Sequence, residues 1–167
     1  MGSELQPEKQ PYGIVEITEL SDIIKMYPRL READLVELNA HGQRDAFRAL
    51  LMSVRCSEKC YTVWVEDKPA AIFGVGRISQ EPSVGSIWLL GTPEIETIKI
   101  QFLRESRKWL EEVGQGYELL TNVVHEDNQL HIRWLKWLGM SFINRQPPFL
   151  EFAKLCSSSL RSSHNKE

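Results

Sequence analysis

Residues 128–140 read Asn-Gln-Leu-His-Ile-Arg-Trp-Leu-Lys-Trp-Leu-Gly-Met, and this stretch decides the fold. At about 100° per residue, its most polar side chains share one narrow arc and the rest of the wheel is apolar. Two polar residues, Asn128 and His131, fall inside the apolar arc. The pattern therefore predicts a buried helix that carries two polar side chains where water is scarce.

The flanks of this helix predict a strand on each side. Gly139 stands where a helix ends in the left-handed conformation, and the apolar residues that follow it read as a strand. Ahead of the helix, residues 117–124 form a short apolar run that ends in two β-branched residues. We therefore expect a strand, the helix and a second strand in succession.

Length and composition bound the class of protein. The 167 residues favour one domain, with 42% hydrophobic and 26% charged residues, which is ordinary for a soluble globular protein. The net charge of -3 gives no reason to expect a nucleic acid or an anionic membrane as partner. No apolar run approaches the roughly 20 residues that a membrane span needs. We expect a cytoplasmic protein.

The ends of the chain and its cysteines are the next features. Residues 1–12 and 156–167 are polar, and we expect a flexible tail and a disordered tail around a single domain at 13–155. The chain has three cysteines and no secretion signal, which favours reduced thiols. Cys56 and Cys60 have no second pair at ligand spacing, so we predict no metal site.

The remaining segments alternate between strand and helix patterns. Asp34 is expected to cap a short helix, residues 79–85 to form a loop, and Thr92 to cap a helix that starts at Pro93. Further strands are expected at residues 13–18, 61–65, 70–78, 86–90 and 149–155. This order predicts an α+β fold: a mixed sheet of about six to seven strands, flanked by helices, with a parallel pair around the helix at Pro93.

This order of elements resembles the GNAT acyltransferase fold. Asn128 followed eleven positions later by the helix-ending Gly139 matches the closing motif of that fold. Four blocks resemble one family more narrowly, the GNAT-like internal virion protein A or virion assembly proteins of short-tailed phages. The blocks are Leu-Arg-Glu-Ala-Asp-Leu-Val-Glu-Leu at 30–38, Ala-Ile-Phe-Gly-Val at 71–75, Trp-Leu-Leu-Gly-Thr at 88–92 and Ile-Arg-Trp-Leu-Lys-Trp-Leu-Gly at 132–139.

The resemblance implies a site between two parallel strands that splay apart, here residues 86–90 and 117–123. In a GNAT enzyme the pantetheine arm of acetyl-CoA lies in that gap, and backbone donors stabilise the developing oxyanion. The cofactor-binding residues that it implies in this chain are Leu89, Leu90, Gly91, Thr92 and Asn128. The diphosphate would rest on the free N–H groups at the start of the next helix.

Two departures from the GNAT pattern stand in the sequence. The glycine-rich phosphate loop is absent. Its place is taken by residues 92–97, Thr-Pro-Glu-Ile-Glu-Thr, which contain no glycine and carry two carboxylates, Glu94 and Glu96. The position seven residues after Asn128, where many GNAT enzymes carry a proton-donating Tyr, is Leu135. The residues that could replace it as catalytic groups are His131, His125 and Glu126.

Several side chains keep a structural alternative. His131 is either catalytic or a buried histidine bonded to a backbone carbonyl. Asn128 and Asn122 either contact a ligand or bond backbone at the strand-to-helix junction. The early helices hold several arginines, which form either a solvated helix face or a contact for an acidic partner. These arginines are Arg29, Arg31, Arg44, Arg48 and Arg55.

Two functions from different classes follow. The first is a GNAT-fold phage protein that acts in virion assembly or infection through contacts with other phage or host proteins, with acetyltransferase activity weak or lost. It would be found in the cytoplasm of an infected bacterium or in the virion. The second is an active N-acetyltransferase that moves an acetyl group from acetyl-CoA to a primary amine. The sequence leaves the acceptor, the partner and the oligomeric state open.

Overall fold

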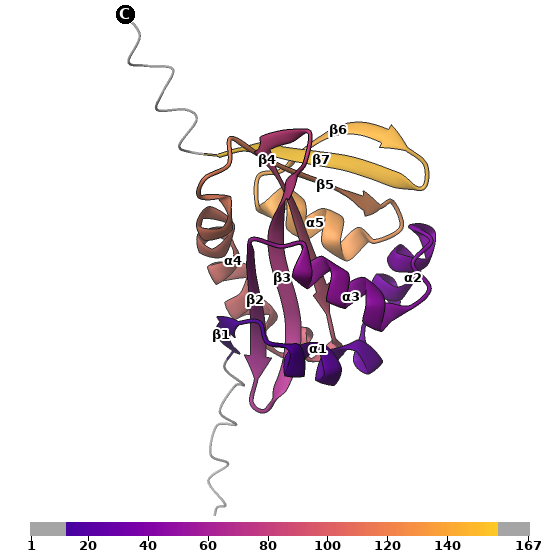
Figure 1. The fold of residues 1–167 in the computed structure, drawn as a ribbon, viewed down its shortest axis with the longest axis vertical. Helices are drawn as coiled ribbons and strands as arrows, with labels where there is room; N and C mark the ends of the chain where they lie inside the picture. Colours follow the sequence, from indigo (N-terminus) through magenta and orange to yellow (C-terminus); the bar gives the residue numbers. More distant parts are fainter. Residues whose placement is uncertain (1–12, 157–167) are drawn as a thin grey trace, which may run out of the picture.

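The computed structural model describes residues 13–156 and is built around one twisted seven-stranded sheet (Figure 1). The strands lie in the order β1-β2-β3-β4-β5-β7-β6, and every neighbouring pair is antiparallel except β4 and β5. Their bounds are β1 Gly13–Ile17, β2 Lys59–Val65, β3 Lys68–Ile78, β4 Glu81–Gly91, β5 Leu119–His125, β6 Ser141–Gln146 and β7 Phe149–Leu155. The α+β class and the mixed sheet expected from the sequence are confirmed.

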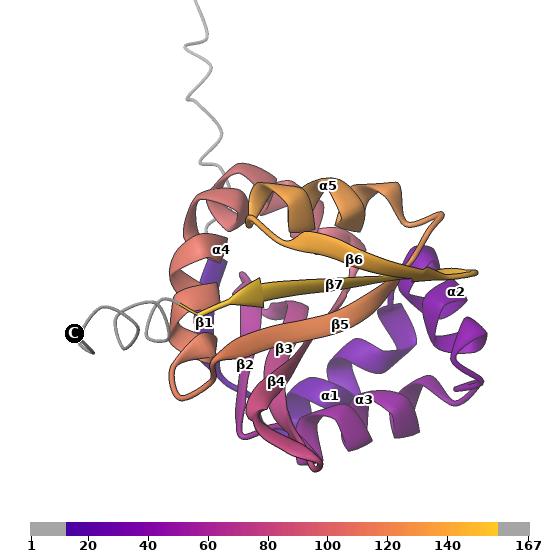
Figure 2. The same ribbon diagram turned by 90° about the horizontal axis from the view of Figure 1, so that it is seen from above.

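Helices cover both faces of this sheet. The α-helices are α1 Leu20–Met26, α2 Glu32–Ala40, α3 Ala46–Arg55, α4 Lys99–Gly114 and α5 Gln129–Trp137, with short 3-10 helices η1 Tyr27–Arg29 and η2 Pro93–Ile98. Seen from above, α4 and α5 lie on one side of the sheet, and α1 and α3 lie on the other (Figure 2). None of these helices has the length and hydropathy needed to cross a lipid bilayer.

Alternating strand residues feed separate cores on the two faces. Ile72 of β3 packs with Ile23, Met26 and Leu50 beneath α1 and α3. Its neighbour Ala71 belongs to the opposite cluster, which holds Ile95 and Ile98 of η2. This period of two places the even-numbered residues of β3 on one face and the odd-numbered ones on the other, as a strand buried on both sides requires.

The central helix α5 is more exposed than its apolar wheel predicts. It begins after Asn128, which caps it, and ends before the left-handed Gly139, as expected. Ile132 and Leu135 are buried, but Leu130 and Trp137 are 47% and 49% exposed. The prediction of a buried helix is therefore right for the side of α5 that packs on the sheet and wrong for the side that carries Leu130 and Trp137.

Two local predictions are wrong, and a third is right only in part. Residues 79–85 do not form a loop: β3 and β4 continue as a hairpin, with a two-residue turn between Ile78 and Glu81. Asp34 does not cap α2, because α2 begins two residues earlier, at Glu32. Thr92 does stand at the N-cap position of the helix after β4, with Pro93 following it, as expected. This helix starts as the 3-10 helix η2, however, and the Thr92 side chain bonds the carbonyls of Pro69 and Ala70 instead of making a capping bond.

Candidate functional site between the splayed strands

The parallel strands β4 and β5 pair over a very short length and then separate. Their register joins Val84 to Leu119, Gly85 to Leu120 and Ser86 to Thr121, and no later residues pair. The two strands run on to Gly91 and His125, so their carboxyl ends stand apart. The splayed pair implied by the resemblance is therefore present.

The side chain of Asn122 closes the narrow end of this gap. Its Nδ2 donates to the carbonyl of Ile87, the first residue of β4 beyond the paired segment. Its Oδ1 accepts from the N–H of Val123 at 2.8 Å. Asn122 thus bonds backbone and replaces one missing ladder hydrogen bond at the point where the strands part.

Beyond this point, alternate residues of β4 turn their backbone groups into the gap. The N–H of Thr92 donates to Ala70 of β3 at 2.8 Å, which fixes the alternation along β4. Leu90 therefore faces β3, whereas Leu89 and Gly91 face the gap. Within residues 13–156, the N–H and C=O of Leu89 make no hydrogen bond in this arrangement.

The same groups of Gly91 are already bonded by the start of α2. The N–H of Gly91 donates to Asp34 Oδ2 at 2.9 Å, and its carbonyl accepts from the N–H of Arg31 at 2.9 Å. The start of α2 therefore occupies both backbone groups that β4 offers at its end. No pattern in the sequence predicted this contact between segments 57 residues apart.

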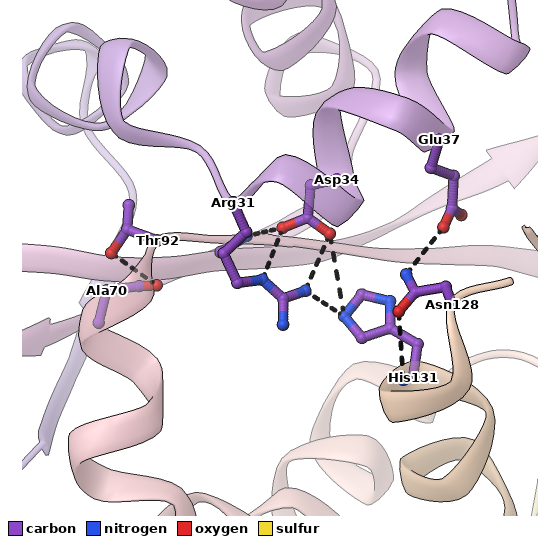
Figure 3. A network of polar contacts seen from close by, with 8 residues as sticks. Arg31, Asp34, Glu37, Ala70, Thr92, Asn128 and His131 are labelled. Carbon is purple, nitrogen blue, oxygen red and sulfur yellow. Dashed lines mark hydrogen bonds and ion pairs between the residues drawn. The ribbon is translucent and has the colours of Figure 1, made fainter.

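Arg31 and Asp34 form a buried ion pair at the open end of the gap (Figure 3). The guanidinium donates from Nε to Oδ2 at 3.0 Å and from Nη2 to Oδ1 at 2.9 Å. The side chains are only 11% and 1% exposed. Two parallel hydrogen bonds fix the geometry of this pair and satisfy its charges away from water.

His131 of α5 completes the cluster from the other side of the gap. Its Nε2 lies against Nη2 of Arg31 and 3.9 Å from Asp34 Oδ1. Burial is the main reason that the pKa of His131 is lowered to about 4; the charge of Asp34 raises the pKa, and the charge of Arg31 lowers it. The ring is therefore neutral at pH 7, with the lone pair of Nε2 facing a donor, so His131 is poorly placed to accept another proton.

Asn128 connects α5 to α2 through Glu37. Its Oδ1 accepts from the N–H of His131 at 3.4 Å, and its Nδ2 donates to Glu37 Oε2 at 3.1 Å. Burial raises the pKa of Glu37, although the hydrogen bonds from Asn128 and from the His125 backbone lower it. Asn128 is thus both a helix cap and one half of a link across the gap.

The turn after β4 is closed by side chains of its own chain. Glu94 makes an ion pair with Arg29 of η1, and its second oxygen, Oε2, is buried and has no hydrogen-bond partner among residues 13–156. Thr97 Oγ1 donates to the Glu94 carbonyl at 2.7 Å. Arg29 and Arg31 therefore hold internal carboxylates, and the expectation of a solvated arginine face is wrong for these two residues.

A cavity of about 310 Å³ fills the space between the splayed strands. It is lined from the α2 side by Glu37 and His41, and from the α4–α5 side by Phe102 and Trp134. Ser53 of α3 also lines it, and because α3 and α4 cover opposite faces of the sheet, the cavity passes through the sheet. Of the predicted site residues, Leu89, Leu90 and His131 are among those that line it.

The other predicted site residues lie outside this lining. Gly91, Thr92 and Asn128 are engaged by the bonds given above. Glu126 makes an ion pair with Arg145 of β6 at 2.9 Å, and His125 Nδ1 accepts from the N–H of Asp127 at 3.2 Å. In the described part of the chain, no group of His, Cys, Asp and Glu side chains has the arrangement of a metal site.

Asp34, Glu37 and Arg31 are the polar residues that sequence reasoning missed at this site. The only signal was the spacing of Arg31 and Asp34, which places them three residues apart at a helix start. Glu37 gave none, because a carboxylate in a short amphipathic segment reads as solvated. These residues meet His131 and Asn128 only because β4 and β5 separate, which allows α2 and α5 to come together.

Comparisons with known proteins give a fold and no family. No protein-family model matches the chain, and no curated protein matches it. An aminoglycoside acetyltransferase, AAC(6')-Ib in complex with ribostamycin and coenzyme A, shares 15% identity and a TM-score of 0.67, covering 93% of this chain and 99% of that one.

Two further solved structures agree. The PaiA N-acetyltransferase of Thermoplasma acidophilum in complex with coenzyme A has a TM-score of 0.63 at 12% identity, over 86% of this chain and 99% of its own. A GNAT-family acetyltransferase of Streptococcus pneumoniae has a TM-score of 0.58 at 13% identity, over 87% and 100%. The chain therefore has the fold of the GNAT acetyltransferases.

Proposed function

We propose that this chain is a GNAT-fold protein that acts through protein contacts in the virion assembly or infection of a short-tailed phage, with acetyltransferase activity weak or lost. The observation that carries the loss of activity is the bonding of both Gly91 backbone groups by Arg31 and Asp34. The phage role rests on the four sequence blocks that resemble virion proteins.

The residues present do not fit acetyl-CoA well. A pantetheine arm needs backbone donors and acceptors along β4, and those of Gly91 are already satisfied inside the protein. A diphosphate at residues 92–97 would meet Glu94 and Glu96 with no glycine to admit it. Each close pair of like charges costs roughly 1 kcal/mol even in water.

Exposed apolar side chains support a role in protein contacts. Ile14 and Ile17 on the edge strand β1, and Leu20 and Ile24 on the following helix, are 53–76% exposed. An edge strand also offers unpaired backbone groups to a partner. These features favour a contact surface next to β1.

The second candidate is an active N-acetyltransferase, and the cavity through the sheet favours it. In that case Leu89, Leu90, Gly91, Thr92 and Asn128 would hold acetyl-CoA. His131, His125 or Glu126 would move protons. This function requires α2 to release Gly91.

A thermal melt with acetyl-CoA separates the two candidates. A ligand at about one hundred times its dissociation constant stabilises a fold by ~2.7 kcal/mol, a rise of roughly 5–10 °C in Tm for a chain of this size. We expect no rise at millimolar acetyl-CoA, either in the native chain or in Glu94→Gly, which removes only one of the obstacles. A rise accompanied by thiol release with an added amine would instead establish the enzyme.

The phage role has its own test. Quantitative mass spectrometry of purified particles should find the chain at a fixed number of copies per particle, or find it only in assembly intermediates. Absence of the chain from both would contradict the proposed role in a virion. The proposal that acetyltransferase activity is weak or lost would not be affected.

A further inference from the structure

The free backbone groups of Leu89 are the part of the gap that the described chain does not use. They face the cavity between β4 and β5. They lie in line with the carbonyl of Ile87, which Asn122 satisfies, and with both backbone groups of Gly91, which Asp34 and Arg31 satisfy. A donor and an acceptor on one residue of a strand are what another extended chain pairs with.

The start of α2 shows that peptide backbone is accepted at this edge. The N–H of Arg31 donates to the Gly91 carbonyl at 2.9 Å, as a neighbouring strand would. Arg31 has extended dihedral angles at this point, with φ -60° and ψ 147°. One residue of the chain itself therefore already pairs with the gap side of β4, and Leu89 is the next pairing position along the strand.

The lining of the cavity indicates which side chains would enter. It is mainly apolar and aromatic, with Phe73, Phe102 and Trp134 among the lining residues. Its carboxylates are Asp34, which Arg31 already pairs, and Glu37 and Glu105; within residues 13–156 no Lys or Arg lines the cavity. This lining suits apolar side chains with a cationic one beside them, and it disfavours an anion.

We propose that the gap between β4 and β5 binds an extended peptide segment of a protein partner, with small apolar side chains flanked by lysine or arginine. The peptide pairs its main chain with Leu89 and places its apolar side chains in the cavity. This inference rests on the proposed function, because it names a second place, besides the surface next to β1, where a protein contact is made, and the chemistry of that contact.

The probe is a fluorescein-labelled pentapeptide, Lys-Val-Ala-Val-Lys, blocked at its carboxyl end and titrated with the full chain. We expect a saturable rise in anisotropy. A matched peptide with an N-methyl group on the central amide should bind about tenfold more weakly, since it loses one backbone hydrogen bond. A peptide with glutamate in place of both lysines should also bind more weakly.

Two variants locate the binding site. Leu89→Pro removes the free N–H without touching the β3 ladder, whereas Leu89→Ile keeps it. Leu110→Trp fills the cavity from α4, and Leu103→Trp adds the same bulk at a more exposed position of the same helix. We expect Leu89→Pro and Leu110→Trp to weaken the peptide at least tenfold, and their two controls to leave it within twofold. Circular dichroism melts confirm that each variant is folded.

The outcomes distinguish this inference from the proposed function. Lack of saturation with the lysine peptide, or equal binding of the N-methylated peptide, overturns the inference alone. Unlabelled pantetheine is added as a competitor. If it displaces the peptide and Leu89→Pro also weakens the peptide at least tenfold, the inference stands. If it displaces the peptide and Leu89→Pro has no effect, the inference is overturned. Saturable binding of acetyl-CoA together with thiol release in the presence of an added amine, by contrast, overturns the proposed function whatever the peptide does.

Discussion

Asp34→Ala should lower the free energy of unfolding by about 3–5 kcal/mol, the usual cost of removing one partner from a buried ion pair. The substitution leaves the Arg31 guanidinium, which is 11% exposed, without its carboxylate. It also leaves the N–H of Gly91 without an acceptor. Both losses fall on buried groups, so water cannot restore them cheaply. Urea unfolding followed by circular dichroism measures the effect.

Two further variants frame this result. Glu32→Ala removes an exposed carboxylate of the same helix and should change stability by less than about 0.5 kcal/mol. Asp34→Asn keeps an oxygen for Gly91 but loses the charge that Arg31 needs, so its cost should fall in between. A loss below about 1 kcal/mol for Asp34→Ala would show that α2 does not hold the end of β4 as described.

Acid should weaken the fold through His131 by about 3 kcal/mol between pH 6.5 and pH 4. The pKa of His131 is about 4 in the fold and 6.5 in its ordinary state. The unfolded chain therefore binds the proton first as the pH falls. The stabilisation due to neutral His131 is complete above pH 6.5 and is lost as the pH falls toward 4.

Other groups titrate in the same range, so the test compares how much stability the native chain and a His131 variant each lose as the pH falls. Burial also lowers the pKa of His41, which adds to the acid effect, and raises the pKa of Glu37, which opposes it. His131→Gln keeps an acceptor for Arg31 and cannot be protonated. Unfolding in urea at pH 7 and pH 4.5 should show a smaller loss in the variant, and equal losses would refute the assignment.

Much of the sheet was predictable because its signals are local. Asn128 and Gly139 bracket a helix by capping chemistry, and the apolar runs beside them have strand composition. The hairpin at residues 79–85 was missed because Pro82 and Gly85 resemble loop residues. Gly85 is needed in the strand for a tertiary reason: a Cβ there would lie 2.7 Å from Val75 and 3.0 Å from Leu120.

The polar cluster was beyond local prediction. Asp34 read as a cap because its neighbours in sequence predict a helix start, whereas its partners Gly91 and His131 are 57 and 97 positions away. His131 and Asn128 were found because they interrupt an apolar arc. What they bond could not be read from that arc, since it depends on how far β4 and β5 separate.

The short parallel register of β4 and β5 also has a mechanical consequence. Strands β1–β4 form one antiparallel part of the sheet and β5–β7 form another. In the described part of the chain, strand pairing joins the two parts only at residues 84–86 and 119–121. A molecule built in this way can widen or narrow the gap between β4 and β5 by a small rotation of one part, with each part keeping its internal hydrogen bonds. A ligand that enters the gap between β4 and β5 would push the two parts of the sheet apart. It would meet the Arg31–Asp34 ion pair at the open end of the gap.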